Sequence, residues 1–126
     1  MDVTPLIPSG RQIIESYGDG RFRVAGAVFE GSILVFPTAT TPWPVTTMAE
    51  LNLASLLHIA ASGQAGEVDL LLLGCGARLQ QVPRDLRAGL RADGVVIEPM
   101  DTGAAARTYN VLMAEGRRVA AALIAV

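Results

Sequence analysis

An unbroken apolar run in the middle of the chain limits the folds open to it. Residues 68–73 contain four consecutive leucines, so a strand formed here would be hydrophobic on both faces. Such a strand is stable where other elements cover the sheet on both sides. Further apolar segments follow at 95–98 and 119–126, and a helical pattern precedes each of them. This alternation predicts parallel strands joined by right-handed helical crossovers, with helices covering the sheet.

Three helices are predicted from capping residues and hydrophobic spacing. The first begins at Thr46 or Thr47, because Thr47 and Glu50 have the spacing of a capping box, and it ends at residues 62–63. The final segment is rich in alanine, which favours helix, but its unbroken apolar run suits a buried strand, and we predict a strand. The other two helices are predicted at residues 83–93 and 103–114.

The first 45 residues are typical of strands and turns. Gly31 is predicted to be the bend of a hairpin that joins strands at 27–29 and 33–36. Earlier strands are predicted at 13–17 and 22–24. Prolines surround Trp43, and since proline cannot donate to a strand ladder, this stretch is predicted to be a loop or an edge strand. The whole chain, 1–126, is therefore predicted to be one α/β domain with three layers and an N-terminal β-hairpin beside the sheet.

Composition narrows the class of protein further. The chain has 126 residues, of which 51% are hydrophobic and 17% charged, which fits one ordered domain with its own core. A single cysteine, Cys75, excludes an internal disulfide and a zinc site of several thiolates, and it suggests a reducing cytoplasm. Residues 1–5 lack the basic segment of a secretory signal, and no apolar run reaches the length of about 20 residues that a membrane span needs.

Charge argues against a nucleic-acid partner. The net charge is -2, and phosphate contacts need clustered basic residues. The nearest cluster is Arg84, Arg87 and Arg91 on one helical face, interleaved with Asp85 and Asp93. We predict a solvated face here, with contact to an anion or a partner as the alternative. The chain has no lysine, which excludes a Walker phosphate loop.

Two turns carry the candidate binding residues. In open α/β sheets ligands gather beyond the carboxyl ends of parallel strands, so turns after neighbouring strands are expected to open on one crevice. The structural alternatives are a tight strand exit at the glycine turn and, at the second turn, a helix cap at Asp101 that also pairs with Arg107. The candidate binding residues at these turns are Gly74, Cys75, Gly76, Asp101, Thr102, Arg107, Thr108 and Asn110.

The sequence predicts no catalytic residue, no cofactor and no metal site. The single histidine, His58, lies in the first predicted helix and is far in sequence from Cys75, so the two do not suggest a nucleophile and its base. Trp43 has two interpretations. It anchors the proline-rich loop onto the core, or, if it is exposed, it belongs to a partner-binding surface.

Several of these segments together resemble the adipogenesis-associated Mth-domain family. The resemblance lies in residues 100–110, in the turn 74–76, and in 20–22 with 31–32, and it extends over about 13–124. It implies a three-layer α/β fold with a mixed central sheet and an extra β layer. The family includes bacterial and archaeal proteins of unknown function and a mitochondrial assembly factor for respiratory complex I. We expect the chain to have no targeting extension like that of the mitochondrial members, which fits a bacterial cytoplasm.

Two functional hypotheses follow. The first is a non-enzymatic binding or assembly module, linked to maturation of a respiratory membrane complex, that presents residues 101–110 and the Trp43 loop to a protein partner. The second is a small-molecule or anion-binding protein or enzyme that uses the crevice between the turns. A homodimer is a further expectation from the hydrophobic excess.

Overall fold

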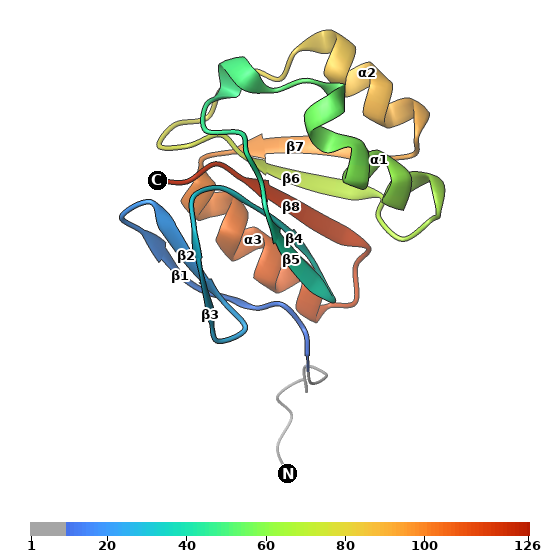
Figure 1. Cartoon of the computed structure of the whole chain (residues 1–126). Helices are drawn as coiled ribbons and strands as arrows, with labels where there is room; N and C mark the ends of the chain where they lie inside the picture. The colour runs from blue at the N-terminus through green and yellow to red at the C-terminus, as the bar shows by residue number, and fades with distance from the viewer. Residues whose placement is uncertain (1–9) are drawn as a thin grey trace.

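The leucine run forms β6 (Leu70–Gly74), the second strand from one edge of a five-stranded central sheet in the computed structural model, which describes residues 10–126 (Figure 1). Strand β6 is parallel to both its neighbours, whereas the strand at residues 33–36 is antiparallel to both of its own neighbours, so the sheet is mixed as predicted. The expectation that residues 1–5 do not begin a secretory signal falls on residues that the structure does not describe. The other strands of the sheet are β7 (Val96–Met100), β8 (Val119–Leu123), β4 (Ile33–Phe36) and β5 (Ala39–Pro42), in the order β5-β4-β8-β6-β7.

Helices cover both faces of this sheet (Figure 1). Helices α1 (Leu57–Gln64) and α2 (Arg84–Ala92) pack on one face, while α3 (Thr102–Ala114) packs on the other. The crossovers β6-α2-β7 and β7-α3-β8 confirm the predicted alternation, and the alanine-rich end of the chain is a strand. No helix within residues 10–126 combines the length and the apolar character needed to cross a membrane.

The first helix begins later than predicted. Instead of one helix from Thr46 or Thr47, the chain makes two short 3-10 turns, η1 (Met48–Glu50) and η2 (Leu53–Leu56), before α1 begins at Leu57. The Glu50 carboxylate does accept the Thr47 N–H at 3.2 Å. Extended backbone at Leu51 and Asn52 then interrupts the helix, because the Asn52 side chain caps a second turn by accepting the Ser55 N–H at 2.9 Å.

The predicted hairpin at Gly31 is wrong. Strand β3 (Ala27–Glu30) belongs to a separate antiparallel sheet with β1 (Ile14–Gly18) and β2 (Arg21–Val24), in the order β1-β2-β3. The chain crosses between sheets at Gly31, where φ is +79°. The physical reason is burial, since β4 is apolar on both faces and pairs with β8 inside the central sheet, whereas β3 is largely exposed.

The small sheet shares a layer with α3 and completes the three-layer arrangement (Figure 1). Its inward side chains Ile14, Phe22 and Val24 are buried against the central sheet and α3. A second hydrophobic core lies on the opposite face, between the central sheet and α1 and α2. Residues 39–42 of the proline-rich stretch form β5 at the edge of the central sheet, while Trp43 and Pro44 lie in the loop that follows it, so both predicted alternatives occur. The N-terminal layer is thus a three-stranded sheet rather than a hairpin.

Candidate functional site

The two turns singled out from the sequence lie at the same end of the central sheet. Gly74, the last residue of β6, lies opposite Met100, the last residue of β7. The Cys75 N–H donates to the Met100 carbonyl at 2.8 Å, and the Thr102 N–H donates to the Gly76 carbonyl at 2.8 Å. The two strands are parallel neighbours, so the turns converge in the way that the sequence predicted.

The converging turns are closed against each other, and this corrects the expected crevice. The Thr102 hydroxyl donates to the Ile124 carbonyl at 2.7 Å and accepts the Gly76 N–H at 2.9 Å. Thr102 is fully buried, and Gly74, Cys75 and Gly76 are buried as well. Polar groups that could have faced a ligand here bind one another instead, because the threonine side chain fills the space between the strand ends.

Cys75 and His58 lie in different surroundings. The Cys75 thiol is only 2% exposed, and its Sγ lies 3.7 Å from the carbonyl oxygen of Leu73 and 3.8 Å from that of Gln80. His58 lies on the exposed surface of α1. Within residues 10–126, no group of three or more histidine, cysteine or acidic side chains is arranged to hold a metal ion.

The polar residues at the start of α3 make contacts within the fold. The Asp101 carboxylate accepts the Ala104 N–H at 2.9 Å, which confirms the predicted helix cap. The Arg107 guanidinium donates to the Tyr17 hydroxyl of β1 at 2.5 Å. Among the described residues it forms no ion pair with Asp101, so that pairing, considered from the sequence, does not occur. Gly103 leaves room for this contact, since an added Cβ would lie 2.6 Å from the Tyr17 hydroxyl oxygen.

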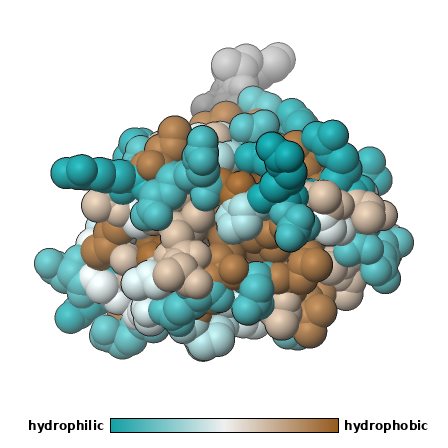
Figure 2. Space-filling view, turned by 90° about the horizontal axis from the view of Figure 1, so that it is seen from above, coloured by the Kyte–Doolittle hydropathy of each residue, from teal (hydrophilic) through white to brown (hydrophobic). Residues whose placement is uncertain are grey.

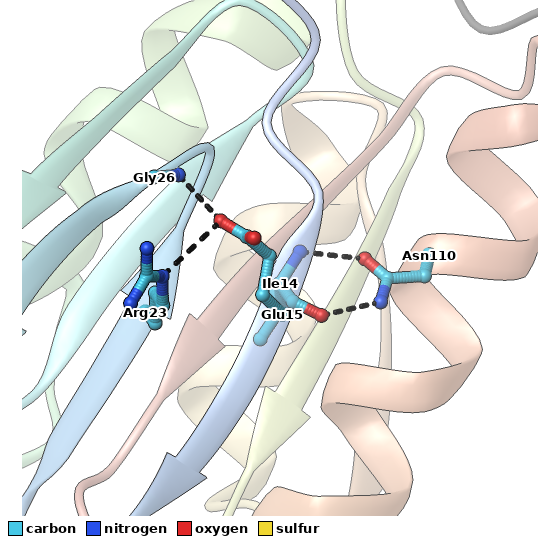
Figure 3. Close-up of polar contacts among 5 residues, drawn as sticks. All are labelled: Ile14, Glu15, Arg23, Gly26 and Asn110. Carbon is cyan, nitrogen blue, oxygen red and sulfur yellow. Dashed lines mark hydrogen bonds and ion pairs between the residues drawn. The ribbon is translucent and has the colours of Figure 1, made fainter.

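Asn110 joins α3 to the backbone of β1 (Figure 3). Its Nδ2 donates to the Ile14 carbonyl at 2.8 Å, and its Oδ1 accepts the Ile14 N–H at 2.9 Å. On the next residue of β1, the Glu15 carboxylate accepts the Gly26 N–H and pairs with Arg23, whose Nε lies 3.8 Å from Oε1. The side-chain amide thus takes the place of a neighbouring strand at this point, and the 101–110 segment docks the small sheet.

Trp43 anchors the proline-rich stretch in the core. Its side chain is only 4% exposed, and its Nε1 donates to the Ser55 carbonyl at 2.7 Å. This confirms the anchoring interpretation, and it means that Trp43 itself offers almost no surface to a partner. Among the predicted residues, Arg107 is exposed, while Asp101, Thr108 and Asn110 are partly buried.

Burial and hydrogen bonding change the acidity of two groups. Burial raises the pKa of Tyr109, since the phenolate would lose its hydration. The Tyr109 hydroxyl has no hydrogen-bond partner among residues 10–126. A hydrogen bond from the Thr46 hydroxyl lowers the pKa of the Glu50 carboxyl, which keeps this carboxylate charged at the first 3-10 turn.

A groove of about 830 Å³ lies beside the closed junction, and the site prediction did not include its residues. The Gln80 side chain links the groove to the glycine turn, because its Nε2 donates to the Cys75 carbonyl at 3.4 Å. The only sequence signal for the groove was the spacing of Arg84, Arg87 and Arg91, a pattern from which a solvated face was predicted. The residues that line it are Leu79, Gln80, Gln81, Val82, Pro83, Arg84, Arg87 and Pro99.

Known proteins are similar to this chain in sequence and in fold. A family model described as "Protein of unknown function (DUF498/DUF598)" matches residues 14–124. An uncharacterized protein of Rhodobacter capsulatus is 47% identical over 116 residues, which cover 92% of this chain and 86% of that protein. The solution structure of a Bordetella pertussis protein, described as a Mth938-like domain, has a TM-score of 0.84 at 31% identity, covering 98% of this chain and 92% of that one.

A vertebrate relative carries a functional name. NADH dehydrogenase (ubiquinone) 1 alpha subcomplex assembly factor 3 of Xenopus tropicalis is 33% identical over 113 residues. The match covers 88% of this chain, but it spans only 60% of the vertebrate protein.

Proposed function

The chain belongs to the family described as Protein of unknown function (DUF498/DUF598), with a Mth938-like fold, and from this premise we propose that it is a non-enzymatic protein-binding module in the assembly of a respiratory membrane complex. The related vertebrate proteins are named as assembly factors, and an assembly factor acts through contacts with other proteins. The proposal carries this mode of action over to the shorter chain.

The closed junction between the two turns is the observation that carries the proposal. In α/β sheets of this kind, small ligands bind beyond the carboxyl ends of the parallel strands. In this protein the buried Thr102 hydroxyl occupies that position, held by Ile124 and Gly76. A filled junction supports binding through the outer surface over catalysis in an internal cavity.

The outer surface has features that suit contact with a protein. Figure 2 shows the molecule from above the view of Figure 1, on the side where α2 lies. On this side hydrophobic side chains are exposed between hydrophilic ones. Leu53 in η2 and Leu57 at the start of α1 are 43% and 64% exposed. Apolar side chains surrounded by polar ones are common at the centres of protein interfaces. The proposal also places the protein in a reducing cytoplasm, because its one cysteine is buried and unpaired.

A deletion experiment tests the proposal. The gene is removed from the source organism, and membranes are separated on native gels with staining for NADH dehydrogenase activity. We expect the assembled NADH:ubiquinone complex to fall, while the other respiratory complexes stay constant and serve as the internal control. A normal amount of the assembled complex in the deletion strain would overturn the proposal.

Complementation then locates the contact surface. Arg107 is the exposed residue of the 101–110 segment, so Arg107→Ala is expected to restore less complex than the wild-type gene does. Arg117→Ala is the matched control, since Arg117 is also exposed and lies beyond the end of α3. Full restoration by Arg107→Ala, with normal protein levels, would remove this segment from the contact surface and leave the assembly function to another face.

A further inference from the structure

We propose that the groove formed by the loop 79–83, α2 and the end of β7 binds an acidic segment of a protein partner. This inference rests on the proposed protein-binding function and names the partner's chemistry. The groove has a volume of about 830 Å³ and is lined by two arginines together with apolar side chains. Its two arginines favour an acidic peptide over a neutral one.

Arg87 is already held in place to receive a carboxylate. Its side chain is partly buried, and one guanidinium nitrogen, Nη1, donates to the Ile97 carbonyl at 3.0 Å. This bond fixes the orientation of the guanidinium and leaves further N–H donors unused. Arginine binds carboxylates through two parallel hydrogen bonds, which a fixed guanidinium can form at a smaller loss of side-chain entropy.

The positive charge of the groove is not neutralised within the fold. Among the residues that the structure describes, no carboxylate lies within 4.0 Å of the guanidinium groups of Arg84, Arg87 or Arg91. At about 100° per residue, these three arginines lie within about 60° of one another around α2, which makes one basic stripe. A partner that is acidic at this stripe would supply the missing counter-charge.

The nearby acidic residues do not share the stripe. Asp85 lies about 100° around α2 from Arg84, and the Asp93 carboxylate accepts a hydrogen bond from Gln64 at 2.7 Å. Glu98 alternates along β7 with Ile97, which is buried on the α2 side, so Glu98 lies on the opposite face of the sheet. The basic stripe therefore remains open to an acidic partner.

The groove holds its partner through side chains rather than by adding a strand. β7 is an edge strand, but Pro99 has no N–H to donate and the Ile97 carbonyl already accepts Arg87. Leu79 is 63% exposed, and Val82, Pro83 and Pro99 add further apolar surface to the lining of the groove. A segment that combines carboxylates with an apolar residue fits both halves of this lining.

The test uses a fluorescein-labelled peptide of alternating glutamates and leucines, with its C-terminus amidated, in anisotropy titrations at low salt. We expect wild-type protein to bind it, and Arg84→Gln with Arg87→Gln to bind at least about tenfold more weakly. Arg117→Gln is the matched control and is expected to bind like the wild type, since Arg117 lies outside the groove. Arg87→Lys keeps the charge but not the paired hydrogen bonds, so intermediate binding is expected.

Each of the following results would overturn the inference: no binding of the peptide by wild-type protein, equal binding by the double variant with a wild-type melting temperature, or equal binding of a peptide with glutamine for glutamate. Binding of a labelled oligothymidylate as tightly as the acidic peptide would also overturn it, because the groove would then be a general anion site.

The same variants separate this inference from the proposed function. If wild-type protein does not bind the peptide and the double variant restores complex assembly in the deletion strain, the groove is excluded while the assembly function stands. If peptide binding follows the arginines but deletion leaves the complex intact, the groove stands and the assembly function falls.

Discussion

The side chain of Asn110 on α3 forms hydrogen bonds with both backbone groups of Ile14 on β1, at 2.8 Å and 2.9 Å. These two residues lie 96 positions apart in the chain, so the pair ties β1 to α3. Arg107 and Tyr17 make a second, exposed link between the same two elements. The polar residues of the 101–110 segment thus explain how the small sheet is held against the rest of the fold.

Replacing Asn110 is expected to loosen the small sheet. Asn110→Ala leaves the partly buried N–H and carbonyl of Ile14 without their partners, which costs about 1–3 kcal/mol in the free energy of unfolding. Urea denaturation measures this loss, and hydrogen exchange at the Ile14 amide reports whether the loosening is local. Thr108→Ala, at a partly buried neighbour on the same helix, is the control and is expected to change stability by less than about 0.5 kcal/mol. Equal effects of the two substitutions would contradict the docking role of Asn110.

The junction between the two turns depends on the Thr102 hydroxyl. Thr102→Val keeps the shape of the side chain but leaves the buried Gly76 N–H and Ile124 carbonyl unpaired, so we expect a loss of about 2–4 kcal/mol. Thr102→Ser retains the hydroxyl and is expected to lose much less. The rate at which a thiol reagent modifies Cys75, the only cysteine, should rise in the valine variant because the turn beside it loosens. An unchanged rate together with unchanged stability would mean that the hydroxyl does not hold the turns together.

The sequence predicted the parts of the fold that depend on local pattern. The leucine run, the helical spacing around Leu86 and Leu90, and the cap at Asp101 each depend on neighbouring residues, and the structure confirms all three. The prediction of a hairpin at Gly31 was wrong because the local sequence of a glycine turn is the same whether the next strand returns to the same sheet or crosses to another. That choice depends on which strands are buried, and burial is settled by the rest of the chain.

The candidate site shows a similar limit. Residues that cap a helix or pair with distant backbone are of the same types as residues that bind ligands, so Thr102 and Asn110 could not be assigned from the sequence. The groove was missed for a different reason. Pro99 and the loop 79–83 come close to Arg87 only because β7 returns beside β6 after α2.

Substitution by alanine is expected to have opposite effects on stability at Gly74 and Gly89, although an added Cβ would meet close neighbours at both positions. A Cβ at Gly74 would lie 2.9 Å from Leu123 and 3.0 Å from the Cα of Thr102, both inside the core. A Cβ at Gly89 would lie 2.7 Å from the side-chain end of Leu53, which is 43% exposed and free to move. We expect Gly74→Ala to cost about 1–3 kcal/mol through overpacking. Gly89→Ala is expected to be neutral or to stabilise by up to about 1 kcal/mol, because alanine favours the helix.

Thermal or urea unfolding of both glycine variants under one set of conditions tests the contrast. Both substitutions add the same methyl group, so the part of the difference that exceeds the helix preference of alanine at Gly89 reports whether the neighbours can give way. A tolerated Gly74→Ala would show that the strand end and the start of α3 adjust more easily than a close-packed core allows.

The buried hydroxyl of Tyr109 is expected to contribute nothing to stability near neutral pH. It has no hydrogen-bond partner among residues 10–126, so Tyr109→Phe should leave the free energy of unfolding unchanged or raise it by up to about 1 kcal/mol. Tyr17→Phe is the control, since it removes the hydroxyl that accepts the Arg107 hydrogen bond and should lower stability slightly. A loss greater than about 1 kcal/mol in Tyr109→Phe would show that the hydroxyl is paired in solution.

The burial of Tyr109 should also make the stability of the protein depend on pH in the alkaline range. Burial raises the pKa of Tyr109 in the folded protein, whereas in the unfolded chain a tyrosine ionises at about pH 10. Above that pH the unfolded state binds fewer protons than the folded state, so the stabilising contribution is complete below about pH 10 and falls as the pH rises further. Urea denaturation of wild type and Tyr109→Phe from about pH 8 to about pH 11 measures the difference, and the wild type should lose more stability than the variant across this range. Parallel curves for the two proteins would mean that the folded and unfolded states ionise this tyrosine alike, which is incompatible with a phenol held in the core between α3 and the small sheet.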